Sequence, residues 1–396
     1  MDLIAVTERR EMQHFQHLED DVREQLFLHA PRSFADSDER DLLAIALGAT
    51  LYVPATRAGL ADIVCKRASE GVSSMVLDLE DAVADHEVES ARANAVEALD
   101  KIASTDAVGM LLFVRVREVA DIHKVAASLT EGRAALTGFV IPKFGSESGP
   151  VFLDAVADAS ELLGKHLYAM PVLESPALVH RDTRDLELRT ISGILGQHRD
   201  RILAVRIGAT DMCSTFGIRR DRDLTIYDVR VVVDVIADIV NYLGRADGSG
   251  FVITGPVWEY FADHERMFRP MLRATPFEEH DAVRFRQHLV SRDLDGLLRE
   301  IALDRANGIQ GKTVIHPSHV AAVNALSAVT HEEYHDALDI LGADAGGVQA
   351  SGYRNKMNEM KPHRNWAHQT ALRAHVFGVT NKGITFVELL TALVDR

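Results

Sequence analysis

Six short apolar runs in this chain each lead into a charged residue, and they recur at nearly even intervals. From Asp78 to Asp211 the successive steps are 37, 28, 31 and 37 residues. One strand plus one helix occupies roughly 30 residues in an eight-unit parallel barrel. Buried parallel strands read as continuous apolar runs, so each run is predicted to be such a strand with a functional tip. The six tips are Asp78, Arg115, Lys143, Glu174, Asp211 and His316, from the segments at 74–83, 111–116, 138–143, 168–175, 205–212 and 312–317.

The predicted fold is a TIM (β/α)8 barrel with an N-terminal helical extension and a C-terminal helical lid or tail. The expected division is 1–48 for the extension, 49–330 for the catalytic barrel and 331–396 for the C-terminal segment. TLYVPAT at 50–56 is predicted to be the first strand and SGFVITGP at 249–256 the seventh, without a charged tip. In the extension, a Ser or Asp of SFADSDE is expected to cap a helix that begins near Asp38.

The connection between strands seven and eight is longer than the others. Gly255 and His316 are 61 residues apart, which leaves roughly 30 residues beyond one strand-plus-helix unit. If these extra residues, within 256–305, leave strand seven on the catalytic face, they set specificity; otherwise they form a peripheral helix or a subunit contact. The tail beyond 330 is rich in Lys, Arg, Asn and His, and both a lid and a solvated or oligomer-forming segment suit it.

Composition narrows the possible partners and location. The net charge of −16 disfavours nucleic acid, because binding a phosphate backbone requires clustered Lys and Arg. Cys65 and Cys213 match no metal-ligand spacing, and the first residues lack the apolar segment of a signal peptide, so a reducing cytoplasm is expected. No apolar run approaches the roughly 20 residues that cross a bilayer. The valine-rich Val229–Leu243 is broken by acidic residues and is predicted to be a soluble helix.

Glu174 and Asp211 are the predicted metal ligands. They lie on successive strand tips, where two carboxylates can offer hard oxygens to Mg²⁺, with Mn²⁺ as the other candidate ion. Two neighbouring buried carboxylates repel each other unless a cation or a shared proton offsets the repulsion. Their joint position therefore indicates a metal or a shared proton.

Two arginines lie at the end of the apolar segment 111–116, Arg115 within it and Arg117 directly after it. The planar fork of Arg115 can hold a substrate carboxylate through two charge-assisted hydrogen bonds. Arg117 lies two residues later and is expected to point the same way, as a second substrate-binding residue. A salt bridge from Arg117 to the nearby acidic cluster is the other interpretation.

The acidic cluster consists of Asp78, Glu80 and Asp81. Glu80 and Asp81 are candidates for an acid or base, while another member is expected to pair with Arg115 or Lys143. Asp78 is also a candidate for contact with the substrate. Lys143 either stabilises developing negative charge or balances this cluster. Its carboxylate-rich surroundings should keep its amine protonated, which disfavours a Schiff base.

This set of residues suits a reaction that passes through an enolate. A divalent ion and an arginine would chelate a 2-oxo acid or a carboxylate and spread the charge that forms as a carbon–carbon bond breaks. The expected substrate is a small anion, either a 2-oxo acid or an acyl-CoA thioester.

At these positions the chain resembles the citrate lyase β-subunit-like group of the HpcH/HpaI aldolase superfamily, over roughly 50–325. LYVPATR is similar to the family's apolar strand and Pro-Gly-x-Arg-like turn, with Ala55 in place of the glycine. VLDLEDAV reproduces the acidic signature, and VRVR resembles Val-Arg-Val-Asn with Arg117 in place of asparagine. The remaining matches are Ala91-Arg92, IPKF at 141–144, LES at 173–175, IGATDM at 207–212 and GIQGKTVIHP at 308–317.

The resemblance implies that Glu174 and Asp211 hold Mg²⁺ and that Arg115 binds the substrate's carboxylate or oxo group. In CoA-using relatives the region of Arg57 approaches the thioester cofactor, and a C-terminal lid, often from a neighbouring subunit, completes the site. Family members commonly assemble, so a homo-oligomer is expected. Arg117 hints at a more acidic or phosphorylated substrate.

The leading hypothesis is a Mg²⁺-dependent carbon–carbon lyase or aldolase. A CoA-thioester lyase, a CoA-independent 2-oxo-acid aldolase and a thioester hydrolase remain open within the enzymatic class. Outside it, a non-catalytic scaffold or ligand-binding barrel remains open.

Overall fold

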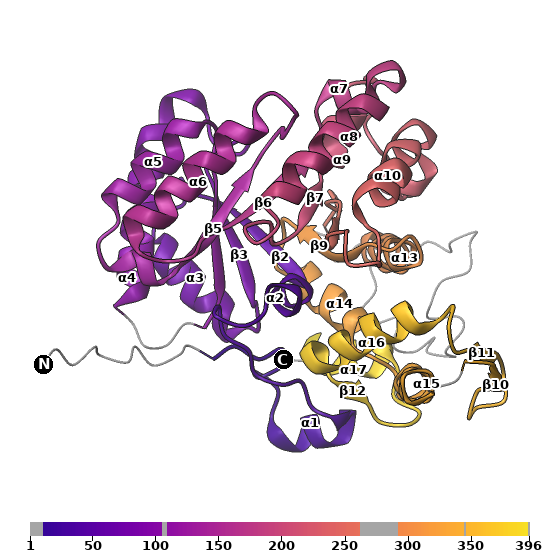
Figure 1. Ribbon diagram of the computed structural model, residues 1–396. Coiled ribbons are helices and arrows are strands. Elements are labelled where there is room, and N and C mark those ends of the chain that lie inside the picture. The colour runs from indigo at the N-terminus through magenta and orange to yellow at the C-terminus, as the bar shows by residue number, and fades with distance from the viewer. Residues whose placement is uncertain (1–10, 105–108, 262–291, 344–345, 395–396) are drawn as a thin grey trace, which may run out of the picture.

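The computed structural model describes residues 11–104, 109–261, 292–343 and 346–394 (Figure 1). Its centre is a closed barrel of eight parallel strands in sequence order, from β2 to β9. The predicted TIM barrel is therefore confirmed. The strands are β2 Ala49–Pro54, β3 Ser74–Asp78, β4 Leu111–Arg115, β5 Leu136–Ile141, β6 Tyr168–Leu173, β7 Val205–Ile207, β8 Ile253–Gly255 and β9 Gln310–Val314.

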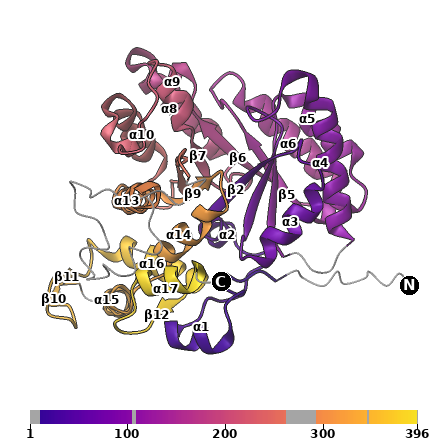
Figure 2. The same ribbon diagram turned by 180° about the vertical axis from the view of Figure 1, so that it is seen from behind.

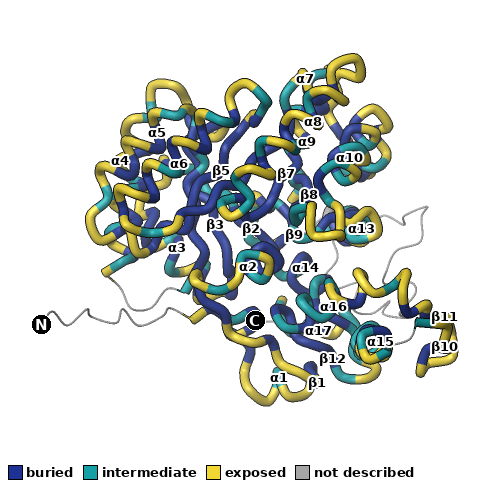
Figure 3. The backbone as a smooth tube through the Cα atoms, in the orientation of Figure 1, coloured by how far each residue is buried: buried dark blue, intermediate teal, exposed yellow. Residues whose placement is uncertain are grey.

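The strands are the most deeply buried part of the molecule, as Figure 3 shows along the barrel. Every residue of β3, β5 and β6 is buried, because helices cover the outside while side chains fill the inside. The register closes the ring by pairing Thr50 of β2 with Thr313 of β9. All strands are parallel, so their carboxyl ends open on one face.

Helices surround the barrel between successive strands. The valine-rich α10 Arg230–Leu243 buries one face made of Val232, Val235, Ile236, Ile239 and Leu243, at the spacing of an amphipathic helix. The predicted helix there is confirmed. The other helices of this layer are α3 Leu60–Ser69, α4 Val88–Ala103, α5 Val119–Ser128, α6 Gly149–Leu163, α7 Pro176–Val179, α8 Arg181–Gln197, α9 Ala209–Ser214, α13 Arg292–Ala306 and α14 Ser318–Ser327.

The N-terminal segment lies across the amino ends of the strands. It contains α1 Asp20–Leu26, β1 Phe27–His29 and α2 Arg40–Ala46. The expected helix near Asp38 is present, but the expected Ser or Asp cap is wrong. Glu39 occupies the N-cap position without a side-chain cap, since Asp38 Oδ2 instead accepts a hydrogen bond from the Ala35 amide.

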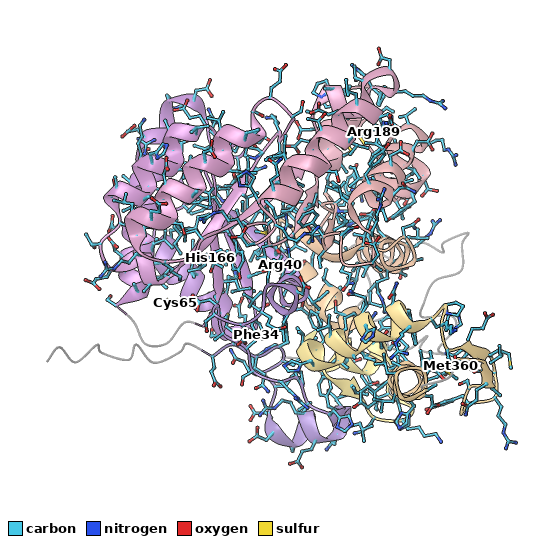
Figure 4. The ribbon with its side chains drawn as sticks, in the orientation of Figure 1. Phe34, Arg40, Cys65, His166, Arg189 and Met360 are labelled. Atoms are coloured by element: carbon cyan, nitrogen blue, oxygen red, sulfur yellow. The ribbon has the colours of Figure 1, made fainter. Side chains whose placement is uncertain are left out.

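The C-terminal segment packs beside the same end of the barrel (Figures 1 and 2). α16 Arg364–Phe377 contacts α2, and β12 Val379–Thr380 pairs antiparallel with β1. In Figure 4, Met360 lies within this group, whereas Arg40 of α2 is directed to the barrel side, where its Nη1 donates to the Arg199 carbonyl at 2.8 Å. The remaining elements are α15 His331–Gly342, β10 Val348–Ala350, β11 Met357–Glu359 and α17 Phe386–Val394.

The position of the C-terminal segment is opposite to the one that a lid over its own active site would need. The segment after 330 lies at the amino ends of the strands, so in its own chain it does not cover the carboxyl-end face. A lid supplied to a second copy of the chain stays a prediction.

Most of the expected 256–305 insertion lies outside the described residues, which stop at Phe261 and resume at Arg292. Within the part of the chain that the structure describes, no helix has the length and apolar character needed to cross a membrane.

Candidate active site

Charged side chains collect at the carboxyl ends of the barrel strands, as the sequence predicts. Asp78 and Arg115 are the last residues of β3 and β4. Lys143, Glu174 and His316 follow their strands within two residues, whereas Asp211 lies in the first turn of α9. The six predicted tips thus lie at one face, although only two of them end a strand.

Asp78 and Arg115 form a bidentate ion pair. Arg115 Nε donates to Asp78 Oδ1 and Nη2 donates to Oδ2, both at 2.6 Å. Asp78 is 2% exposed and also accepts the Glu80 amide at 3.0 Å. The sequence predicted that one member of the acidic cluster pairs with Arg115 or Lys143, and the structure pairs Asp78 with Arg115. Asp78 lies too deep to be an open substrate contact in this geometry, and it fixes the orientation of the guanidinium.

Glu80 joins Arg115 to Lys143. Its carboxylate lies 3.1 Å from Arg115 Nη1 and 2.6 Å from Lys143 Nζ. Burial raises the pKa of Glu80, with its hydrogen bond to Asp81 acting in the same direction. The Asp81 side chain is exposed, though not completely. Its partial burial acts to raise its pKa, but the hydrogen bond with Glu80 and the charge of Lys143 outweigh this effect and lower the pKa overall. Asp81 is therefore the carboxylate of this cluster that is ionised and open to solvent.

Lys143 links this cluster to Glu174. Its backbone has a φ of +47°, a conformation that side-chain-bearing residues rarely adopt. In that conformation the Lys143 amide donates to Glu174 Oε1 at 2.9 Å. Burial would lower the pKa of its amine, but the hydrogen bond and charge of Glu80 raise it above the usual range. The ammonium group stays protonated, which argues against a Schiff base.

Glu174 and Asp211 form the pair predicted to bind metal. Glu174 is 4% exposed, and burial together with the negative charge of Asp211 raises its pKa to about 8. Burial also raises the pKa of Asp211, and the charge of Asp81 adds to this effect. A Cβ atom at Gly208 would lie 1.8 Å from Glu174 Oε2. The glycine of the Gly-x-x-Asp motif thus lets the backbone lie against this carboxylate.

These two carboxylates fit a hard divalent cation. Burial and repulsion from a neighbouring carboxylate raise both pKa values even though Arg115 and Lys143 lie nearby, so a bound cation would favour the ionised carboxylates. Among the described residues, no group of three or more His, Cys, Asp or Glu side chains forms a metal cluster. A site with two protein ligands suits Mg²⁺, which usually keeps several waters.

Arg117 and Arg57, both predicted to bind substrate, lie outside the cluster formed by Arg115, Lys143 and the carboxylates. Arg117 Nη2 donates to the carbonyls of Glu80 and Val83, and Nη1 pairs with Asp85. Because β4 ends at Arg115, strand alternation no longer aligns Arg117 with it, and the salt-bridge interpretation fits better. Arg57 is exposed in the loop after β2, and its guanidinium makes no ion pair with any described residue. Its role at a cofactor stays a prediction.

The structure also brings two residues to this site that were not predicted. Tyr52 of β2 packs between two guanidinium groups, 5.3 Å from Arg115 and 5.4 Å from Arg206, measured from each Cζ to the ring centroid. Arg206, in the middle of β7, is 1% exposed. The available signal was an arginine inside the apolar run LAVRIGAT.

A family model described as "C-C_Bond_Lyase of the TIM-Barrel fold" matches residues 41–379. The chain belongs to this family. The expected class, a carbon–carbon lyase, is thereby confirmed at the level of the family. A comparison with curated proteins gives no match.

Solved structures share the fold of this C–C bond lyase. CitE from Mycobacterium tuberculosis, in complex with magnesium, acetoacetate and coenzyme A, has a TM-score of 0.52 and 21% identity over 84% of this chain and 99% of that chain. A citrate lyase from Burkholderia xenovorans LB400 has a TM-score of 0.59 and 15% identity over 88% and 96%. Haloferax volcanii malate synthase in its magnesium/glyoxylate complex has a TM-score of 0.50 and 14% identity over 70% and 74%. With the family match, these structures confirm the resemblance to citrate lyase-like barrels.

Proposed function

We propose that this protein is a Mg²⁺-dependent carbon–carbon lyase or aldolase acting through the enolate of a 2-oxo acid or of an acyl-CoA thioester. The observation that supports this most is the buried Glu174 carboxylate, which lies near Asp211 and accepts a hydrogen bond from the backbone amide of Lys143. A carboxylate pair at a barrel's catalytic face, bordered by an arginine and a lysine, suits stabilisation of a developing oxyanion.

Glu174 and Asp211 would hold the Mg²⁺ ion, with Mn²⁺ as the other candidate. When bound, the ion supplies Lewis-acid stabilisation of negative charge on a substrate oxygen. The neighbouring M. tuberculosis CitE was solved with magnesium, acetoacetate and coenzyme A, which supports the same cofactors here.

The residues of this chain have separate roles in the proposal. Arg115, oriented by Asp78, binds the carboxylate or oxo group of the substrate through Nη1, which Asp78 does not hold and which the substrate would share with Glu80. The Lys143 ammonium, held by Glu80, adds positive charge beside the developing oxyanion. Asp81, ionised and exposed, accepts the hydroxyl proton of the substrate as the carbon–carbon bond breaks.

The barrel 49–330 would be the catalytic unit, with Arg57 near a CoA thioester. The C-terminal segment 331–396 lies at the opposite end of its own barrel, so a lid would come from a second copy in a homo-oligomer. The contact of α16 with α2 supports the first part of this proposal, because it holds the segment at the amino end of its own barrel.

An enolisation assay tests the proposed function without knowledge of the full substrate. The protein is incubated in D₂O with Mg²⁺ and with pyruvate, acetyl-CoA or both, and ¹H NMR follows loss of the methyl signal. We expect Mg²⁺-dependent exchange, because an enolate takes up deuterium from solvent. Exchange should disappear in Glu174→Gln and Asp211→Asn and persist in Asp158→Asn, an exposed carboxylate on α6.

The same assay separates the alternatives. Exchange of pyruvate that is unchanged by CoA thioesters indicates a CoA-independent aldolase, and exchange of acetyl-CoA indicates a thioester enzyme. Release of free CoA without carbon–carbon cleavage indicates a hydrolase. Absence of exchange, together with no binding of Mg²⁺ by calorimetry, would contradict the proposal and favour a non-catalytic barrel.

A further inference from the structure

Arg206 is a buried cation without an acidic partner. It projects from β7 into the barrel, where Nη2 donates to Thr313 Oγ1 at 2.5 Å and Nη1 lies 3.4 Å from Thr50 Oγ1 and 3.8 Å from Met170 Sδ. Its Nε has no hydrogen-bond partner, its side chain also hydrogen-bonds to Tyr52, and among the described residues no carboxylate forms an ion pair with its guanidinium. Burial lowers the pKa of Arg206.

Other deeply buried cations in the described chain are neutralised locally. Lys312 lies 2.9 Å from Glu300 and 2.7 Å from Asp304, and Arg92 lies 2.9 Å from Asp121. Removing an ion from water is unfavourable unless an opposite charge and hydrogen bonds compensate. Arg206 is thus a buried charge that hydrogen bonds alone compensate, which is what a group that binds an anion requires.

Tyr52 connects Arg206 to the catalytic face. Its ring lies between the guanidinium groups of Arg206 and Arg115, and burial raises the pKa of its hydroxyl, although both arginines act to lower it. The hydroxyl is therefore protonated and can donate a hydrogen bond. Tyr52 and Thr313 are both only partly buried, in contrast to Arg206 itself.

The depth of Arg206 fits the length of a small acid. Arg206 pairs in register with Val172 of β6, two residues before Glu174, which follows that strand, and two strand residues span about 7 Å. A molecule whose oxo-acid end lies near Arg115 and Glu174 can thus carry a further charged group toward the interior.

We propose that Arg206, Tyr52 and Thr313 form a subsite for a second anionic group of the substrate. The substrate is then a dianion that carries a distal carboxylate or phosphate in addition to its reacting oxo-acid or thioester end. The reaction in this statement rests on the proposed function, whereas the binding subsite does not. The sequence linked a second negative charge on the substrate to Arg117, and the present proposal gives the binding of that charge to Arg206 instead.

Matched ligands test this subsite. Calorimetry with Mg²⁺ compares 2-oxoglutarate with 2-oxopentanoate, which has the same chain length without the second carboxylate, and 3-phosphonopyruvate with 2-oxobutanoate. We expect one dianion to bind at least about tenfold more tightly than its partner, the effect of a hydrogen bond to a charged group. Whichever dianion shows the preference identifies the distal group as carboxylate or phosphate.

Arg206→Met should abolish that preference and leave the melting temperature of the ligand-free protein unchanged or higher, because an uncompensated buried charge is removed. The matched control is Arg92→Met, which should lower the melting temperature by leaving Asp121 unpaired and keep the preference. If Arg206→Met fails to fold, Tyr52→Phe tests the subsite, since it removes only a hydroxyl and should reduce the preference.

Equal binding of both members of each pair by the wild type would overturn the proposal, as would a preference that survives Arg206→Met. Because binding is measured, the outcome is separate from enolisation. A preference that depends on Arg206 in a protein without hydrogen exchange supports the subsite and contradicts the proposed reaction. Hydrogen exchange in a protein that shows no preference for either dianion supports the proposed reaction and contradicts the subsite.

Discussion

Replacing Glu174 with glutamine should stabilise the metal-free protein and abolish its stabilisation by Mg²⁺. Glu174 is 4% exposed and close to Asp211. In the absence of a cation, burial and the charge of Asp211 make its ionised form unfavourable. Glutamine keeps the side-chain shape without this charge, so it relieves the repulsion but cannot provide a carboxylate ligand.

The size of the effect follows from the pKa. In the folded protein the pKa of Glu174 is raised from 4.5 to about 8, and each unit of difference is worth about 1.4 kcal/mol. Below pH 4.5 the Glu174 carboxyl is protonated in both the folded and the unfolded protein, and it does not reduce the free energy of unfolding. As the pH rises toward 8, the unfolded protein ionises this group more readily than the folded protein, and the free energy of unfolding falls. At pH 7 the loss is about 3 kcal/mol. The advantage of Glu174→Gln should thus be absent near pH 4.5 and approach its full size near pH 8.

Urea unfolding at several pH values, with EDTA or with saturating Mg²⁺, measures this free energy. Mg²⁺ at 100 times its dissociation constant should stabilise the wild type by about 2.7 kcal/mol and leave Glu174→Gln unaffected. Glu300→Gln is the control: its carboxylate pairs with Arg220 and Lys312, so it should destabilise under every condition. A Glu174→Gln protein that is less stable than the wild type in EDTA would refute the reasoning.

Other predictions concern the cations. Arg115→Lys keeps the charge but loses the fork bound to Asp78, so enolisation should fall by about 10- to 100-fold in the NMR assay; unchanged exchange would remove Arg115 from the site. Lys143 has a raised pKa, so borohydride added with pyruvate should trap no adduct by mass spectrometry; an adduct lost in Lys143→Met would show a Schiff base. Lys312→Met should lower the free energy of unfolding by about 3–5 kcal/mol, because it leaves buried Asp304 without its cation; a stability equal to wild type in urea would contradict this.

The spacing of apolar runs was sufficient to predict the barrel and the face on which Glu174 and Asp211 lie. Strand periodicity does not mark where a strand ends, however. The structure ends β4 at Arg115 and β7 at Ile207, so Arg117 turns to the loop of Val83 and Asp85, and Asp211 projects from a helix.

Long-range packing was also beyond the sequence. The composition of the tail gave no indication that α16 would contact α2 at the amino ends of the strands. A single arginine in an apolar run does not show whether a carboxylate lies opposite it. Only the assembled barrel, with Thr50 and Thr313 around Arg206, reveals that its hydrogen-bond partners carry no negative charge.

The pairing of β1 with β12 has a consequence for synthesis on the ribosome. Phe27 lies opposite Thr380, and Asn381 Nδ2 donates to the carbonyls of Glu24 and Gln25. The partners of an early segment are thus translated more than 350 residues after it. Until then Phe27, which is 6% exposed in the finished protein, has no covering strand. Apolar surface that stays exposed during synthesis is prone to aggregate, so Phe27 contributes to that risk until Val379 and Thr380 have been translated.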